Sequence, residues 1–169
     1  MTTYSSSTDD TRSTQGNPAR LFAVVAFAEM VTWTLLILGM IGKYVLQLGD
    51  LGDLGVRIGG SLHGFAFLCF CLVTVLVAVD QRWSVRDLLM GLASAVIPYA
   101  TVPFERSALR RGLLGQRWRL RDEPGRGPVE KVVAESVRHP LPAALVAGLT
   151  IVAVFSALLL AGPPTQWFS

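Results

Sequence analysis

Four apolar segments alternate with polar or charged stretches along this chain. The first runs from Leu21 to Gly42 and contains a single charged residue, Glu29. At about 1.5 Å per residue, a helix of this length crosses the roughly 30 Å hydrocarbon core of a bilayer. It is longer than the apolar part of a signal peptide, which has about 7–15 residues. The pattern therefore predicts a retained transmembrane helix.

Three more apolar segments follow, at residues 58–79, 88–104 and 141–162. The segment 88–104 is short and contains Pro98 and Pro103, and proline interrupts helices. We therefore expect this span to be short, kinked or re-entrant. The pattern as a whole predicts an all-α polytopic transmembrane helix bundle. It has a three-helix membrane core at residues 20–105 and a fourth, C-terminal transmembrane helix.

Three polar stretches, the two tails and one loop, flank or separate the apolar segments. Residues 1–19 are rich in Ser and Thr and predict a disordered tail. Residues 47–57, QLGDLGDLGVR, predict a short Gly-rich loop, whose Asp50 and Asp53 are too few for a calcium loop of the EF-hand kind. Residues 163–169 form a short tail in which Trp167 and Phe168 suit the membrane interface.

The stretch 106–140 is strongly basic: nine of the fifteen Lys and Arg residues lie between positions 105 and 139. In RSALRRGLLGQRWRLR, arginines alternate with leucines and Trp118 at near-helical spacing. This spacing predicts an amphipathic helix on an anionic leaflet, with a solvated or partner-bound loop as the alternative. The expected membrane-surface basic residues are Arg106, Arg110, Arg111, Arg117, Arg119 and Arg121.

Composition supports a membrane protein, because 51% of the residues are hydrophobic and 16% are charged, against about a quarter in soluble domains. The net charge of +3 arises mainly in the basic loop, so nucleic acid is not an expected partner. The expected partners are a lipid bilayer with anionic headgroups and either other membrane proteins or a second copy of the chain.

Orientation follows from where the basic residues fall. Four spans would place both tails and the turn 80–87 on one side, and the basic loop with Lys43 and Arg57 on the other. The positive-inside rule then predicts a multi-pass protein of the cell (inner or plasma) membrane, with loop 105–139 cytoplasmic and both termini outside. If the segment 88–104 is re-entrant, the Lys and Arg residues on each side of the membrane must be counted again.

Polar side chains inside the apolar spans are candidates for function. A carboxylate at membrane depth is unfavourable, so Glu29 should face the bundle interior and be protonated or hydrogen-bonded, in a structural or a functional role. Helix rise places Glu29 and His63 about 10 Å apart in depth, so direct contact would need tilted helices, a water or a ligand. The candidate intramembrane polar site comprises Glu29, His63, Lys43 and Thr32.

The sequence contains no paired carboxylates, nucleophile–base pair or metal-ligand spacing. Cys69 and Cys71 lie two apart on opposite sides of one helix, so they are interpreted as packing residues. We therefore expect no catalytic residue, no metal and no cofactor, and the chain is not predicted to be an enzyme.

The order of several residues resembles the DUF3817 family of small bacterial integral membrane proteins over residues of about 19–105. The residues that carry the resemblance are Arg20, Glu29, Trp33, Gly39-Met40, Lys43-Tyr44, Gly60, His63-Gly64 and the stretch Pro98 to Phe104. The chain has Met30-Val31-Thr32 after Glu29 where the family commonly reads G-x-S. The resemblance implies a three-helix membrane core with polar positions Glu29, Lys43 and His63, and it implies no activity.

Three functions are compatible with these observations. The first is a non-catalytic accessory or scaffolding subunit of a membrane complex, favoured by the small size and the basic loop. The second is a small-solute or proton translocator that uses Glu29. The third is a heme- or quinone-associated membrane protein with His63 as a ligand and His139, on the same predicted side, as the second histidine.

Overall fold

The computed structural model describes residues 16–161, which are helical with short connections and contain no strand in that range. The elements are α1 Pro18–Met40, the π-helix η1 Ile41–Val45, α2 Asp50–Asp80, α3 Val85–Val96, α4 Thr101–Arg110, α5 Arg119–Asp122, α6 Pro128–Arg138 and α7 Pro140–Ala161. The all-α prediction is confirmed. Most of the predicted N-terminal tail, and the C-terminal tail with Trp167 and Phe168, lie outside the described residues.

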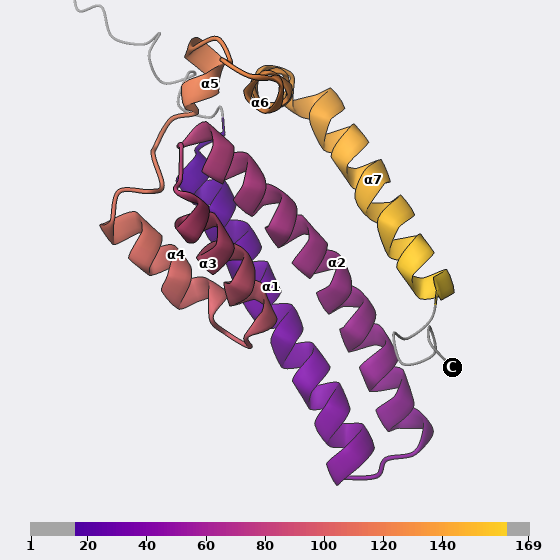
Figure 1. Cartoon of the computed structure of the whole chain (residues 1–169). Helices are drawn as coiled ribbons and strands as arrows, with labels where there is room; N and C mark the ends of the chain where they lie inside the picture. The colour runs from indigo at the N-terminus through magenta and orange to yellow at the C-terminus, as the bar shows by residue number, and fades with distance from the viewer. Residues whose placement is uncertain (1–15, 162–169) are drawn as a thin grey trace, which may run out of the picture.

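The longest helices, α1 and α2, form an antiparallel pair (Figure 1). Asn17 caps α1, since its side-chain oxygen accepts a hydrogen bond from the backbone N–H of Ala19 at 2.9 Å, and Pro18 follows at the favoured first position. At its other end α1 continues without a break into η1. The first apolar segment is thus one rod, Pro18–Val45, long enough to cross a membrane.

The predicted Gly-rich loop at 47–57 is wrong from Asp50 onward, because residues 50–57 are the first turns of α2. The glycines lie against α1: a Cβ on Gly52 would be 2.7 Å from the Cα of Lys43, and one on Gly59 would be 2.9 Å from the carbonyl oxygen of Leu35. Glycine permits this backbone approach, which packs helices where the hydrophobic effect between them is weak.

The segment 88–104, expected to be a short, kinked or re-entrant span, is not a single helix. The segment is divided between α3 and α4, which form a hairpin beside α1 (Figure 1). Pro98 disfavours helical backbone at Ile97, which is extended at ψ 120°, and Tyr99 has a φ of 66°. Within the described chain, the helices long and apolar enough to span are therefore Pro18–Val45, Asp50–Asp80 and Pro140–Leu158.

An aromatic cluster joins the base of this hairpin to α1 and α2. The Phe22 ring on α1 lies 5.3 Å from that of Phe70 on α2 and 6.2 Å from that of Phe104 on α4, measured between centroids. Trp83, in the turn after α2, packs on both Phe22 and Phe104, and its indole N–H donates to the carbonyl of Leu113 at 2.7 Å. This cluster fixes the hairpin at the end of the molecule where α1 begins.

The basic segment does not form the single amphipathic helix predicted for residues 106–121. The chain leaves α4 at Arg110, Gly112 adopts a φ of 70°, and the short α5 starts only at Arg119. A left-handed glycine is a common helix terminator, which explains the break. The helix with one buried apolar edge in this region is α6, where Val133 and Ala134 are buried.

Candidate functional site

Glu29 is fully buried on α1, eleven residues after Pro18 and thus about 16 Å along the helix, in the middle part of the rod Pro18–Val45. The hairpin meets it there. The hydroxyl oxygen of Thr101, the first residue of α4, lies within hydrogen-bond distance of Glu29 Oε2, at 2.9 Å, and of the carbonyl oxygen of Ala26, at 3.2 Å. The other carboxyl oxygen, Glu29 Oε1, has no hydrogen-bond partner. The site therefore combines a buried acid with a break in the membrane helices.

The next turn of α1 connects this acid to His63. The Thr32 hydroxyl donates to the backbone carbonyl of Glu29 at 2.9 Å and lies 3.4 Å from Nδ1 of His63. The Trp33 ring lies 4.2 Å from the imidazole, centroid to centroid, and its N–H donates to the carbonyl of Ala95 on α3 at 3.3 Å. Among the described contacts, Glu29 and His63 are linked through Thr32 rather than bonded directly.

Lys43 does not belong to this cluster. Its ammonium group pairs with Asp53 on α2 at 2.9 Å, at the opposite end of α1 from the aromatic cluster. Of the four residues in the predicted polar site, the structure brings together Glu29, Thr32 and His63, and it places Lys43 elsewhere.

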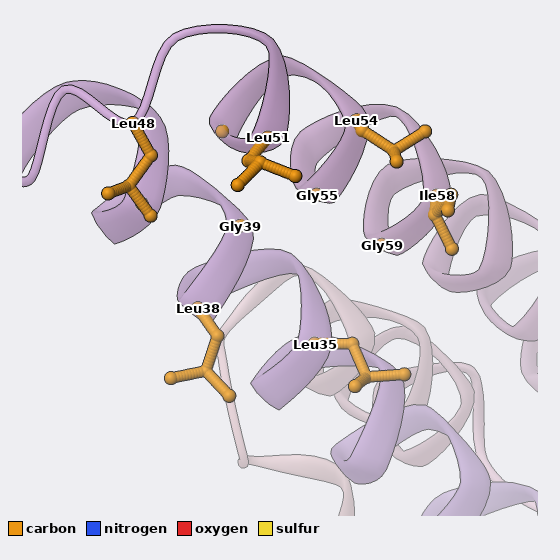
Figure 2. Close-up of a pocket in the computed structure, with 11 residues that line it drawn as sticks. Leu35, Leu38, Gly39, Leu48, Leu51, Leu54, Gly55, Ile58 and Gly59 are labelled. Atoms are coloured by element: carbon orange, nitrogen blue, oxygen red, sulfur yellow. The ribbon is translucent and has the colours of Figure 1, made fainter.

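A shallow groove follows the glycine crossing of α1 and α2. Leucines from both helices, including Leu35, Leu38, Leu51 and Leu54, flank Gly39 and the glycines of α2 (Figure 2). The residues that line this groove are glycine or aliphatic. It therefore offers apolar contact and no group for acid–base chemistry.

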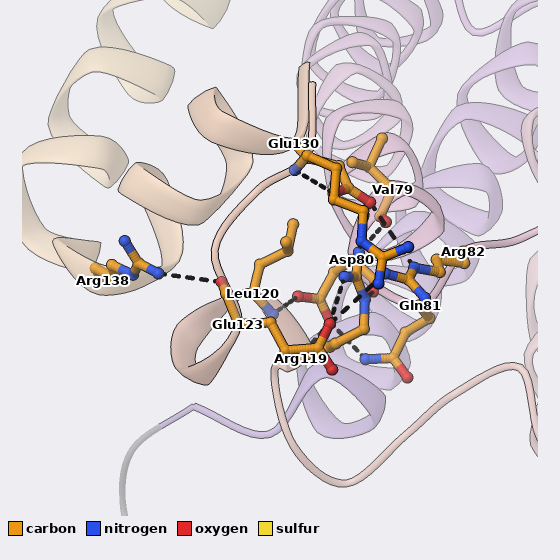
Figure 3. A network of polar contacts seen from close by, with 10 residues as sticks. Val79, Asp80, Gln81, Arg82, Arg119, Leu120, Glu123, Glu130 and Arg138 are labelled. Carbon is orange, nitrogen blue, oxygen red and sulfur yellow. Dashed lines mark hydrogen bonds and ion pairs between the residues drawn. The ribbon is translucent and has the colours of Figure 1, made fainter. Parts of the chain in front are cut away.

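A second buried acid, Asp80, ends α2 and holds the basic segment in place (Figure 3). Its carboxylate accepts the backbone N–H groups of Arg119 at 3.1 Å and Leu120 at 2.9 Å, together with the amide of Gln81. Arg119 Nε in turn donates to the carbonyl of Asp80 at 2.6 Å. We call α5, α6 and the connection between them the basic cap, which Asp80 fixes to α2.

Two of the six arginines predicted to face lipid form ion pairs with carboxylates. Arg119 pairs with Glu123 at 3.0 Å and with Glu130 at 2.8 Å. Arg111 pairs with Asp87 at 2.5 Å, across the hairpin. Arg106 and Arg110 are exposed on α4. The basic segment is thus a folded layer with internal pairs.

Two carboxyl groups outside the spans have shifted pKa values. The pKa of Glu130 is lowered, first by the hydrogen bond that it accepts from the backbone N–H of Arg126 at 2.8 Å and then by Arg119. The pKa of Asp87 is lowered by the hydrogen bond from the Ser84 hydroxyl and by Arg111. Both groups favour their charged forms in the folded cap and hairpin.

The two histidines are far apart along the fold. His63 lies in the middle of α2, whereas His139 follows α6 in the basic segment and pairs with Glu135 at 3.4 Å. The structure therefore does not form the pair of histidine ligands that the heme hypothesis requires. Within residues 16–161, no group of three or more His, Cys, Asp or Glu side chains is arranged to hold a metal ion.

Sequence reasoning missed two residues that organise these sites. Thr101 looks like an ordinary residue between Pro98 and Pro103, and only the folding of the hairpin brings it to Glu29. Asp80 looks like the start of a turn, and its partners lie 39 and 40 residues later. A charged residue that directly ends a long apolar segment was the available signal for Asp80.

Comparisons with known proteins agree with this architecture. The model of DUF3817, a family described as a domain of unknown function, matches residues 19–110 and so ends at the last residue of α4. A Streptomyces coelicolor protein named "Putative membrane protein SCO5905" is 42% identical over 98 residues. That match covers 57% of this chain and 11% of the relative, so the chain spans only a small part of that protein's length. No solved structure matches the chain.

Proposed function

The chain belongs to the DUF3817 family, a family of membrane proteins, and we propose that it is a non-catalytic accessory subunit of a larger membrane complex. In this proposal α7 is the helix that contacts the partner, and the polar cluster around Glu29 and His63 stabilises the fold. The observation that carries the proposal is the open small-residue face of α7.

Helix α7 has the length and hydropathy of a membrane span but packs little on the rest of the chain. Figure 1 shows it alongside α2. Its contact with α2 includes the Phe155 ring, which lies 3.0 Å from the position of a Cβ on Gly64. On the opposite side of α7, Ala153 and Ala157 are both exposed. Small residues four apart allow close approach of another membrane helix.

The comparisons support an association of this kind. The family match stops at residue 110, so α7 lies outside the shared unit. In the Streptomyces relative, the matched segment is 11% of a much longer polypeptide. A unit that is covalently joined to a longer chain in one protein is a reasonable subunit of an assembly in another.

Affinity purification in mild detergent tests this proposal, with wild type, Ala153→Leu and Val152→Leu as baits. Val152 is exposed on a neighbouring side of α7, about 100° from Ala153, so its substitution is the matched control. We expect a stoichiometric membrane partner with wild type and Val152→Leu, and its loss with Ala153→Leu. Recovery of the chain alone, or only of its own oligomer, from all three samples contradicts an accessory role.

The hairpin changes the expected orientation. The start of α1 lies at the same end as the basic segment, where Asn17 and Gln116 form a hydrogen bond, so the expectation of both termini opposite the basic loop does not hold. In the described chain, every Lys and Arg except Lys43 and Arg57 lies toward this end. We infer that this end is cytoplasmic in the cell membrane.

Cysteine labelling in intact cells tests this orientation in a Cys69→Ala/Cys71→Ala background. A cysteine at Ser84 should be protected from an impermeant maleimide, and a cysteine at Gln47 should react. The reverse pattern overturns the assignment.

A second candidate function, proton translocation, is favoured by the unpartnered Glu29 Oε1 near mid-membrane. Proton flux into vesicles that is equal for wild type and Glu29→Gln contradicts it.

A further inference from the structure

The contact between Glu29 and Thr101 contains too few protons if Glu29 is ionised. The Thr101 hydroxyl has one proton, but two acceptors lie within hydrogen-bond distance: Glu29 Oε2 at 2.9 Å and the carbonyl oxygen of Ala26 at 3.2 Å. With a carboxylate, this single proton must serve both oxygens while Oε1 stays unpaired. A charged acid in this place is therefore poorly provided with donors.

A protonated Glu29 removes the shortage. The acid O–H at Oε2 donates to Thr101 Oγ1, and the Thr101 O–H donates to the carbonyl of Ala26. Both hydroxyl protons then have an acceptor. The remaining Oε1 is then the carbonyl oxygen of a neutral acid. Leaving such an oxygen unpaired costs less than leaving a carboxylate oxygen unpaired in an apolar interior.

The surroundings contain little that would favour the charged form. Lys43, in η1, lies about 21 Å from Glu29 along the continuous rod of α1 and η1 and pairs with Asp53. From α2 the titratable neighbours are the Cys71 thiol and His63, and His63 reaches Glu29 only through Thr32. The Trp33 indole N–H is a further donor near Glu29, but it already donates to the carbonyl of Ala95 on α3. Glu105 lies one turn beyond Thr101 on α4. The N-terminus of α4 presents partial positive charge to Glu29. The stabilisation that a helix N-terminus gives a carboxylate is smaller than the hydration free energy that the carboxylate loses on burial.

We propose that Glu29 is a proton-binding site and that its protonated form holds the α3–α4 hairpin on α1. When the proton leaves Oε2 for water, the carboxylate needs donors that Thr101 alone does not provide. The hairpin tip then separates from α1 and admits water. This assignment rests on neither proposed function, since a proton-dependent contact serves a subunit as well as a translocator.

Infrared spectroscopy of the full chain in nanodiscs detects the acid directly. At neutral pH we expect a carboxylic acid C=O band that is absent in Glu29→Gln. Thr101→Val should move the band to higher wavenumber because the acid O–H loses its acceptor, and Thr101→Ser should leave it in place. A wild-type acid band that appears only near the ordinary glutamate range, about pH 4.3, overturns the proposal. The wild-type titration decides this even if a variant fails to fold.

Hydrogen exchange at residues 97–104 tests the coupling to the hairpin. After correction for intrinsic exchange rates, wild-type protection should fall at least tenfold as pH rises through the loss of the infrared band. The hairpin in Glu29→Gln should stay protected throughout, since a side-chain amide does not ionise in this pH range. The turn 81–84 serves as an internal control. Equal pH dependence in wild type and Glu29→Gln, or none in wild type, overturns the coupling.

Discussion

Asp80 and Glu29 are both fully buried carboxyl groups, but the chain provides for them in opposite ways. Asp80 receives two backbone N–H groups and a side-chain amide, and the guanidinium of Arg119 lies against its backbone carbonyl. The carboxyl group of Glu29 has a single hydroxyl within hydrogen-bond distance, that of Thr101, and one of its oxygens has no partner. Burial alone therefore does not tell whether an acid is a structural anchor.

The difference follows from position as well as partners. Asp80 lies at the end of α2, where the free N–H groups at the start of α5 supply donors to an anion. Glu29 lies in the middle of α1, where neighbouring N–H groups are already used by the helix. The first acid thus has donors enough for an anion, whereas the second has few, as suits a group that binds a proton.

The largest effect is expected for Asp80→Ala. The substitution leaves the N–H groups of Arg119 and Leu120 without their acceptor, which should cost about 3 kcal/mol of the local stability of the basic cap. Limited trypsin cleavage after Arg117 to Arg126 should then accelerate by about two orders of magnitude. Asp122→Ala, which removes an exposed acid from the same segment, is the control. Equal cleavage of both variants would show that Asp80 is not the anchor.

A matched pair of amide substitutions breaks the comparison most directly. Asp80→Asn removes a charge that accepts N–H groups and should lower the free energy of unfolding by about 1–2 kcal/mol. Glu29→Gln replaces one neutral group by another and should stay within about 1 kcal/mol of wild type. Thermal unfolding in detergent measures both. Losses of similar size in the two variants would mean that the two acids are equivalent.

Trp33→Phe sharpens the comparison at the Glu29 side without touching a charge. The variant keeps an aromatic ring beside His63 but loses the indole N–H that bonds the carbonyl of Ala95 at 3.3 Å. The hairpin should be destabilised by about 1 kcal/mol. Hydrogen exchange of α3 reports this change, with the basic cap as the region that should remain unaltered.

The smallest effect is expected for the loosening of the basic cap at low pH. Because the folded pKa of Glu130 lies below the ordinary value of about 4.3, its contribution is fully present above that value. The contribution is lost as pH falls through the lower folded pKa. Protection of α6 amides should decline over this acidic range, and Glu130→Gln should flatten the decline. An unchanged profile in the variant would assign the acid sensitivity to another group.

The sequence predicted the long apolar helices well, because length and hydropathy alone determine them. It failed for QLGDLGDLGVR, since Gly and Asp are turn residues in isolation. Their helical role depends on contact with the backbone of α1 at Leu35 and Gly39 and of η1 at Lys43, which a linear pattern does not contain. The sequence left the form of 88–104 open for a related reason: two prolines fit a kinked span as well as a re-entrant hairpin.

The candidate site was predictable only in part. A carboxylate in an apolar run identifies Glu29 from the cost of burying charge, and the same argument selected His63. Lys43 was included although its partner, Asp53, lay in the segment interpreted as a loop. Thr101 and the Asp80 contacts depend on segments that meet only after folding, so residue type and spacing do not reveal them.

The end of the α1–α2 pair at which residues 46–49 join the two helices, here called the closed end, has a consequence for how the chain enters a membrane. The connection there, residues 46–49, is very short, and the charged residues around it are Lys43, Asp50, Asp53 and Arg57. These four charges sum to zero, so a transmembrane voltage does almost no net work when this end crosses the bilayer. Insertion of the helical pair is therefore driven by its apolar length. The arginines at the other end, where α1 begins and α2 ends, resist transfer across the bilayer.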